Sequence, residues 1–398
     1  MPKRELASGC TSEDVVMSNI TFAERPKASP RPAFSCSDPI ALRLNPPPPI
    51  IDVFDPIIRR AIGNILEHSS PSSIIGHHRW CGTERDREAG AVLCETRLGY
   101  RPDAGRIVLT SSTQSSLNML LPGLVGDGGV LAVDELTYPP IKVFAARYGI
   151  KLAPVRLDDE GITPDAFRAV CEQERPKALY PLSTLQNPTT GTMSLQRRQE
   201  IVAIARHYNV SIIEDDIYSL IPENAPPPLS ALAPEISWYL LGLAKSVAPG
   251  TKVAYVVAPS TSEARRLFWP GVRATFWMTA PLSAALATEL VEARTLFDLL
   301  HAVRAATATR HRLVHQHFRS MDYRLGAGGL HVWIATPPGK TSAGVATELE
   351  HTGVLVSTSD GFVIGDTPVP DTIRIGLGNP ATDNILESAL TIISSTCS

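Results

Sequence analysis

One lysine, Lys245, lies in a stretch of sequence that could turn its side-chain amine into a nucleophile. An apolar run at 239–243 leads into it, and a turn of mostly small residues separates it from a second apolar run at 253–258. We expect both runs to be buried strands, where a solitary charged amine is costly. Burial lowers the pKa of an amine, and a neutral lysine attacks carbonyl carbons. These residues alone leave two interpretations open: Schiff-base chemistry, or an ordinary lysine in a strand connection.

Other polar residues with chemical uses follow other apolar segments. A run of hydroxyl side chains occupies 110–116, Tyr138 follows the segment 130–133, and Asn187 follows 178–182. Hydroxyls at the start of a helix suit a phosphate group, although the same residues also serve as ordinary helix caps. For the other two, a buried loop tyrosine and a plain Asn-Pro turn are the simpler interpretations.

Three consecutive carboxylates, Glu214, Asp215 and Asp216, follow the apolar pair 212–213. Like charges this close repel one another unless a cation or a protonated partner is present. A metal ion could supply that charge, but no histidines lie nearby at ligand spacing. We therefore predict no metal site.

The pattern of the chain predicts elements that would bring these groups together. Short apolar segments alternate with helical patterns, which implies a mostly parallel sheet covered by helices on both faces. Ligands bind at the carboxyl ends of the strands in such a sheet, so we expect the polar groups to converge there. The predicted strands are 106–110, 130–133, 151–157, 178–182, 210–213, 237–241 and 253–258. The predicted helices are 51–68, 83–98, 113–121, 140–148, one opened by Thr163-Pro164, and 195–208.

Composition divides the chain into three parts. Residues 1–40 are rich in Ser, Pro and charge and are expected to form a mobile arm. A large domain is predicted over 41–278 and a smaller α+β domain over 279–398. The smaller domain should begin with a long helical stretch, from 281 to about 317, and end in strands at 329–334, 354–357 and 373–377.

The overall composition is that of a globular protein. The 398 residues are 43% hydrophobic and carry a formal charge of −3, which gives no electrostatic reason to expect nucleic acid or an acidic membrane as partner. No apolar leader and no run of 18 apolar residues is present, so a cytoplasmic protein is expected. The six cysteines are scattered without a C-x-x-C pair, which indicates reduced thiols. They are Cys10, Cys36, Cys81, Cys94, Cys171 and Cys397.

Taken together, these motifs resemble those of fold-type I pyridoxal-phosphate (PLP) enzymes in the class I/II aminotransferase group. The resemblance is greatest to the aminotransferase-like domain of MocR regulators and to aminoadipate/kynurenine aminotransferases, and it covers about residues 42–390. It implies an α/β fold like that of aspartate aminotransferase. The motifs are Ser-Ser-Thr-Gln at 111–114, Leu-Thr-Tyr-Pro at 136–139, Gln-Asn-Pro-Thr at 186–189, Glu-Asp-Asp-Ile-Tyr at 214–218, Ala-Lys-Ser-Val-Ala-Pro-Gly at 244–250 and Ile-Arg-Ile-Gly at 373–376.

The resemblance implies a PLP site with Lys245, Asp215 and Tyr138 as its catalytic residues. Lys245 would bind the cofactor as a Schiff base and later move a proton. Asp215 would pair with the ring nitrogen, so that the ring acts as an electron sink, and Tyr138 would stack on the ring. The other cofactor contacts it implies are Ser112, Thr113, Gln114, Asn187, Tyr218, Lys252 and His77.

The resemblance also implies substrate contacts. Arg374 would clamp the α-carboxylate of the substrate, a task that suits a planar two-pronged donor. Asn45 and Asn187 are expected to contact the substrate as well.

The sequence departs from the family pattern at four places. Lys252 stands where an arginine usually holds the phosphate, Gly242 replaces a serine, and Ser112 replaces a glycine. Where a neighbouring subunit usually offers a tyrosine, this chain has His-His-Arg-Trp at 77–80. One of these histidines could substitute for the tyrosine, and a solvated loop is the alternative.

The leading functional hypothesis is an aminotransferase that exchanges an amino group between an L-amino acid and a 2-oxo acid, as a homodimer with shared active sites. The altered phosphate-binding residues keep a second hypothesis open. It is PLP-dependent elimination or replacement (for example on S-adenosylmethionine), oxidation or carbon–carbon bond formation. A ligand-sensing regulator is the third, and we expect it least because only about 40 residues precede the predicted fold.

Overall fold

The computed structural model describes residues 39–276 and 278–397. The predicted mobile arm, together with Cys10 and Cys36, therefore lies outside the described residues, except for the last two positions of the arm. The four cysteines in the described ranges are buried and unpaired. Within these ranges, no helix is both long enough and apolar enough to cross a membrane.

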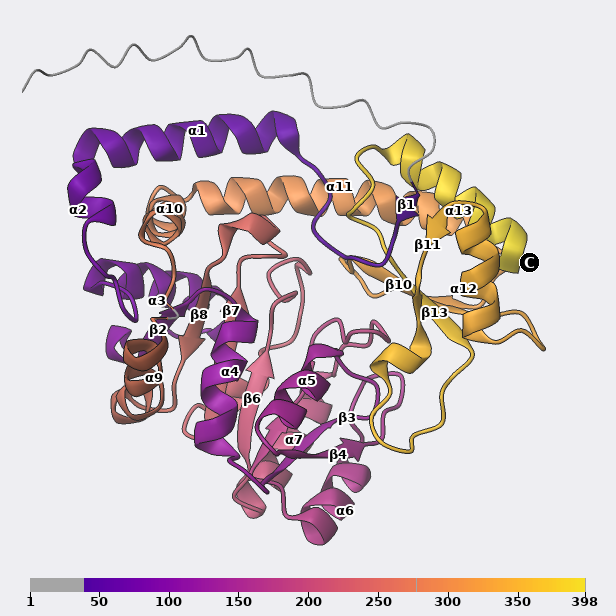
Figure 1. Cartoon of the computed structure of the whole chain (residues 1–398), viewed down its shortest axis with the longest axis horizontal. Coiled ribbons are helices and arrows are strands. Elements are labelled where there is room, and N and C mark those ends of the chain that lie inside the picture. Colours follow the sequence, from indigo (N-terminus) through magenta and orange to yellow (C-terminus); the bar gives the residue numbers. More distant parts are fainter. Residues whose placement is uncertain (1–38, 277, 398) are drawn as a thin grey trace, which may run out of the picture. The chain divides into compact units, whose positions relative to one another are not determined.

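A seven-stranded sheet forms the centre of the fold (Figure 1). Its strand order is β2-β8-β7-β6-β5-β3-β4, and every neighbouring pair is parallel except the two that involve β8. The prediction of a mostly parallel sheet is therefore confirmed. The strands are β2 (Ile107–Thr110), β3 (Val130–Asp134), β4 (Lys151–Val155), β5 (Ala178–Tyr180), β6 (Ser211–Asp215), β7 (Ser237–Gly242) and β8 (Ala254–Val257).

Helices cover both faces of this sheet. Successive residues of a strand point to opposite faces, so a strand contributes side chains to two cores. Val108 and Val256 pack into one core with α4 and α9, whereas Ile107 and Val257 pack into another with α3 and α10 (Pro281–Glu292). Strands β2 and β8 therefore bury both of their faces, which explains their continuous apolar sequences. The helices associated with this sheet are α3 (Glu84–Leu98), α4 (Thr113–Leu124), α5 (Pro140–Arg147), α6 (Pro164–Glu174), α7 (Leu195–His207), α8 (Leu229–Leu232) and α9 (Thr261–Thr275).

Local capping fixes where several of these helices begin. The side chains of Ser112 and Ser194 accept hydrogen bonds from the first turns of α4 and α7. Pro164 occupies the first position of α6 as expected, but the Thr163 side chain before it makes no capping hydrogen bond. Among these helix starts, that of α4 is the most relevant to the predicted site, because it places the hydroxyl-rich run at the end of β2.

The C-terminal part contains more helix than the sequence predicted. The helical stretch expected from 281 to about 317 consists of two helices: Arg294 adopts a left-handed conformation, with φ of 62°, and separates α10 (Pro281–Glu292) from α11 (Thr295–His317). The strand-rich ending also includes α12 (Ser342–His351) and α13 (Asp383–Cys397). The domain boundary near residue 278 falls between α9 and α10 and stays a prediction.

A second, antiparallel sheet lies in this part, beside α12 and α13 (Figure 1). Its order is β12-β13-β10-β9, and it carries Arg374 at the centre of β13, opposite Trp333 of β10. The strands are β9 (Tyr323–Arg324), β10 (His331–Ala335), β12 (Ser357–Thr358) and β13 (Thr372–Gly376).

The first described residues connect the two sheets. Strand β1 (Ile40–Ala41) pairs with β11 (Val354–Leu355), and the chain then runs through 42–50 into α1 (Ile51–His68) and α2 (Pro71–Ile75). This segment passes so close to Gly376 that a Cβ atom there would lie 1.9 Å from the Leu44 carbonyl oxygen. Only glycine permits this approach, which holds Asn45 over the end of the central sheet.

Candidate active site

A cavity of about 580 Å³ lies at the carboxyl ends of β5, β6 and β7, where the polar residues were expected to converge. The predicted site residues that line it are Asn45, Thr113, Tyr138, Asn187, Asp215, Tyr218, Lys245 and Arg374. Ser112 and Gln114 flank Thr113 at the start of α4 but do not line the cavity. The parallel sheet therefore brings together most of the predicted set.

Lys245 lies in the turn between β7 and β8, and its amine points into this cavity. Burial, together with the positive charge of Arg374, lowers the pKa of Lys245 to about 7, although Asp215 opposes the shift. Its Nζ donates hydrogen bonds to the carbonyl oxygen of Asn45 at 2.7 Å and to Asn45 Oδ1 at 2.9 Å. A large fraction of this amine is therefore neutral at neutral pH, as a nucleophile requires.

Asp215 ends β6 and presents one free carboxylate oxygen. Its Oδ2 accepts a hydrogen bond from the Tyr180 hydroxyl at 3.1 Å, whereas the buried Oδ1 has no hydrogen-bond partner among the described residues. Burial raises the pKa of Asp215 to about 7. A buried, unpartnered acceptor of this kind suits a cationic N–H group, which would also restore the carboxylate to its charged form.

The two neighbouring carboxylates face the other way, as alternation along a strand requires. Glu214 lies 3.7 Å from the guanidinium of Arg198, and Asp216 lies 3.4 Å from that of Arg97. The repulsion expected from three adjacent carboxylates is thus relieved by two arginines, the buried Arg198 and the partly buried Arg97. Across the described ranges, no group of three or more His, Cys, Asp or Glu side chains is arranged to hold a metal ion.

Tyr138 and the start of α4 form one end of the cavity. Gln114 Nε2 donates a hydrogen bond to the Tyr138 hydroxyl, and Ser112 caps the helix by accepting from the Ser115 backbone N–H at 3.0 Å. The free N–H groups of this helix end make it suitable for an anion.

Gly242 gives Thr113 the space it occupies at this end of the cavity. A Cβ atom on Gly242 would lie 3.0 Å from Thr113 Cγ2 and 3.3 Å from the side chain of Ile217. The serine of the family pattern would therefore crowd Thr113, which accounts for the glycine in structural terms.

Arg374 and Asn187 form the opposite wall of the cavity. Arg374 Nη1 donates to Asn187 Oδ1 at 2.9 Å, its Nη2 donates to the carbonyl oxygen of Arg43, and its guanidinium lies 5.2 Å from the centre of the Phe362 ring. The buried Nε atom has no partner in the described part of the chain. The arginine is therefore fixed in place and retains donor capacity for a carboxylate.

Tyr218 connects the cavity to the segment from 42 to 50. Its hydroxyl accepts a hydrogen bond from Asn45 Nδ2 at 2.7 Å. Burial raises the pKa of Tyr218 to about 12, so the hydroxyl stays protonated and can donate in turn.

Two predicted residues, Lys252 and His77, are not in the cavity. Both are exposed, and neither lines it. Lys252 adopts a left-handed conformation, with φ of 51°, directly after the short helix Pro249–Thr251. Their roles stay predictions.

Sequence reasoning missed several residues of the site. Tyr180, which bonds Asp215, could have been noticed as a hydroxyl within an apolar strand. Ser357 and Phe362 reach the cavity from the C-terminal part, and Leu44 from the segment before α1, and nothing in their local sequence marks them.

Comparison with known proteins places this geometry in context. The family model for aminotransferase class I and II matches residues 93–391. An uncharacterized HTH-type transcriptional regulator of Bacillus subtilis, YdeF, is 28% identical over 307 residues, which cover 76% of this chain and 65% of the regulator. The 2-aminoadipate transaminase of Thermus thermophilus is 27% identical over 260 residues, which cover 62% and 64% of the two chains. The chain thus spans less than two thirds of the length of these relatives.

Solved structures show the same fold. The kynurenine aminotransferase of Pyrococcus horikoshii, solved in complex with PMP, aligns with a TM-score of 0.81 over 91% of both chains at 21% identity. LysN, the alpha-aminoadipate aminotransferase of Thermus thermophilus, aligns with a TM-score of 0.80 over 90% of this chain and 92% of its own at 20% identity. An aspartate aminotransferase of Thermus thermophilus aligns at 0.76 over 90% of this chain and 96% of its own, with 18% identity. The predicted aspartate-aminotransferase-like fold is therefore confirmed.

Proposed function

The chain belongs to the aminotransferase class I and II family, and from this premise we propose that it is a PLP-dependent aminotransferase. It would exchange an amino group between an L-amino acid and a 2-oxo acid. One observation carries the proposal: a buried amine with a lowered pKa, a carboxylate with a free oxygen and an arginine fork share one cavity. These are Lys245, Asp215 and Arg374.

The residues present fit pyridoxal phosphate. When bound, the cofactor supplies an electron sink that stabilises negative charge at the substrate Cα atom. The unpartnered Asp215 Oδ1 would accept a hydrogen bond from the protonated ring nitrogen. Tyr138 would cover one face of the ring, while Asn187 and Tyr218 would bond its hydroxyl oxygen. The residues at the phosphate would be Ser112, Thr113 and Gln114, at the start of α4.

Lys245 would carry the reactive amine. Because the pKa of Lys245 is lowered to about 7, its Nζ can be neutral and attack a carbonyl carbon. The same nitrogen, placed within the cavity, would remove the proton from the substrate Cα atom and hold it for return. Asn45, which accepts two hydrogen bonds from Nζ, would keep the amine in place before substrate enters.

Arg374 would orient the substrate by its α-carboxylate. Its guanidinium is braced by Asn187 and by the backbone of the segment before α1, so little side-chain freedom is lost on binding. A carboxylate here would also bring the substrate next to Asn45. This arrangement fixes the Cα–H bond relative to Lys245.

We propose further that the chain acts as a homodimer. Exposed apolar side chains on α1 and α2 support this, since such residues often mark contact surfaces. They are Ile51 (58% exposed), Leu66 (52%) and Ile75 (64%). The exposed His77 follows α2, and in a dimer it would be placed to reach a neighbouring cofactor phosphate. Lys252 remains a proposed phosphate contact on its own chain.

One observation favours a second candidate function, ligand sensing within a transcription regulator. The likeness to YdeF, which is named as a transcriptional regulator, covers more of this chain than the likeness to the transaminase does. A sensing domain would bind the same small molecules without turning them over. The two functions differ in whether product appears.

The experiment that tests the proposal is a two-substrate assay. The purified chain with its cofactor is incubated with a panel of L-amino acids and 2-oxoglutarate, and both products are measured by mass spectrometry. An aminotransferase forms glutamate and the matching 2-oxo acid in equal amounts. Ammonia without glutamate would indicate elimination instead, and spectral change without any product would indicate sensing.

A further inference from the structure

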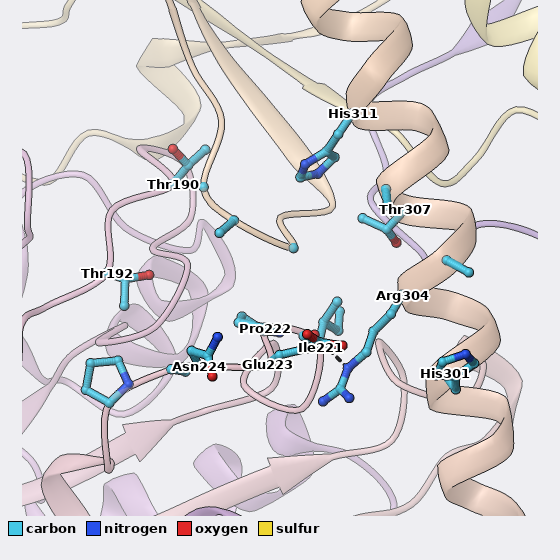
Figure 2. A pocket seen from close by; sticks show the side chains of 17 residues that line it. Thr190, Thr192, Ile221, Pro222, Glu223, Asn224, His301, Arg304, Thr307 and His311 are labelled. Atoms are coloured by element: carbon cyan, nitrogen blue, oxygen red, sulfur yellow. Dashed lines mark hydrogen bonds between the residues drawn. The ribbon is translucent and has the colours of Figure 1, made fainter.

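A second cavity, of about 640 Å³, lies outside the candidate active site. Its walls come from helix α11, the turn at 221–226, the loop at 190–192 and the loop at 326–328 (Figure 2). The residues that line it are separate from those of the first cavity, so the two are distinct spaces.

The chemical centre of this cavity is Arg304. Its Nε donates to the carbonyl oxygen of Ile221 at 2.9 Å, and its Nη2 donates to that of Leu220 at 2.8 Å. Figure 2 shows the side chain reaching from α11 toward this turn. Neither a carboxylate partner nor an acceptor for Nη1 is found for this guanidinium among residues 39–276 and 278–397. The structure thus holds a positive charge beside the cavity that forms no ion pair with any carboxylate of the described residues.

The rest of the lining is mainly apolar or uncharged. Nine of the seventeen lining residues are small or apolar: Ile221, Pro222, Ala225, Pro226, Ala305, Ala308, Gly326, Ala327 and Gly328. Burial lowers the pKa of His311, whose Nε2 lies 2.7 Å from the carbonyl oxygen of Gly329. Glu223, the one carboxylate in the lining, is exposed to solvent. Such a lining suits a ligand with an apolar body and one anionic end.

The cavity shares structural elements with the candidate active site. Ile221 N–H donates to the carbonyl oxygen of Tyr218 at 3.0 Å, and Thr190 N–H donates to that of Gln186 at 2.7 Å. Tyr218 and Asn187, on these same two turns, line the first cavity. A ligand in the second cavity would therefore contact both turns that carry residues of the proposed active site.

We propose that this second cavity binds an organic carboxylate with an apolar body, whose negative end pairs with Arg304. Carboxylate is the favoured anion because the guanidinium fork matches its two oxygens. The space is large enough for a molecule of amino-acid size. Binding here does not depend on the aminotransferase reaction.

The test uses 4-methylpentanoate and its neutral amide as probes, with binding measured by calorimetry on the full chain with its cofactor. Arg374→Ala provides the background, because it removes the carboxylate clamp of the first cavity. Ala308→Trp, one helical turn after Arg304, fills the second cavity with a bulky ring. Ala343→Trp, on an exposed position of α12, is the matched control.

We expect saturable binding of the carboxylate in the Arg374→Ala background and in its Ala343→Trp derivative. The Ala308→Trp derivative should bind at least about 10-fold more weakly, since the ring and the probe compete for one space. The amide should also bind more weakly, because it lacks the charge. In the chain with Arg374 intact, the carboxylate should bind in both cavities, and Ala308→Trp should remove binding in the second cavity only. The proposal is overturned if the background shows no saturable binding, if Ala308→Trp binds like Ala343→Trp, or if amide and carboxylate bind equally.

Discussion

Lys245 Nζ donates hydrogen bonds to both the backbone oxygen and the side-chain oxygen of Asn45, a residue 200 positions earlier in the chain. Asn45 in turn donates to the Tyr218 hydroxyl. The segment before α1 is thus part of the site and holds the proposed nucleophile in place. Several consequences can be measured.

Asn45→Ala should weaken catalysis without unfolding the chain. The change removes one hydrogen bond from Lys245 and one from Tyr218, each worth about 1 kcal/mol. We expect kcat/KM to fall about 10-fold or more. Steady-state kinetics will measure this, and Asn64→Ala, which removes an amide bonded to Glu289 on α10, is the control. An unchanged kcat/KM in Asn45→Ala would show that this contact has no part in the reaction.

The pH dependence of cofactor attachment should report the lowered pKa of Lys245. Only the neutral amine attacks, so the rate rises as pH increases through the pKa and levels off above it. With a pKa of about 7, the rise should centre near neutrality, well below the value of an ordinary lysine. Stopped-flow mixing of cofactor-free protein with pyridoxal phosphate will give the profile. A rate that keeps rising up to pH about 10 would contradict the burial argument.

Asp215→Asn should keep the shape of the site and lose much of its activity. The amide cannot hold a protonated ring nitrogen by charge, so we expect kcat to fall about 100-fold or more, as when a pre-placed electrostatic partner is removed. Both kcat and the melting temperature are measured. The melting temperature should change little.

Asp216→Asn is the matched control for Asp215, because it removes a carboxylate from the adjacent position. It leaves the partly buried Arg97 without its charged partner, and breaking a buried pair costs about 3 kcal/mol. We expect a lower melting temperature with the cofactor still bound. If Asp216→Asn instead abolished cofactor binding while Asp215→Asn did not, the assignment of the two aspartates would be reversed.

Gly242→Ser should lower the affinity for cofactor, although it restores the serine of the family pattern. The new Cβ atom would lie 3.0 Å from Thr113 Cγ2, and relieving the overlap should cost about 1 kcal/mol. Cofactor titration followed by fluorescence measures the loss. Adding Thr113→Ser removes the crowded methyl group and should recover the affinity. A double variant as weak as Gly242→Ser would refute this steric account.

The convergence of the site was predictable from the sequence for a topological reason. Carboxyl ends of neighbouring parallel strands share one edge, so Tyr138, Asn187, Asp215 and Lys245 could be brought together before any contact was known. The alternation of side chains along β6 also predicts that Asp215 points away from Glu214 and Asp216. The two arginines that pair with Glu214 and Asp216 could be identified only from the structure.

Contacts made by distant segments were not predictable. The position of Asn45 depends on a close approach between its own segment and Gly376, which local sequence does not reveal. Helix α9 was missed, and it contains Pro270, a residue that usually ends helices. The break at Arg294 was not predicted, because no proline or glycine marks it. The helix is interrupted there because Arg294 adopts a left-handed backbone conformation.

The most direct test of the proposed chemistry is to trap the bond between cofactor and protein. The chain is incubated with pyridoxal phosphate, reduced with borohydride, digested and analysed by mass spectrometry. We expect one pyridoxyl group, located on the peptide that contains Lys245, and no labelled peptide from Lys245→Ala. A label on another lysine, or an equally labelled Lys245→Ala chain, would contradict the assignment of Lys245 as the nucleophile.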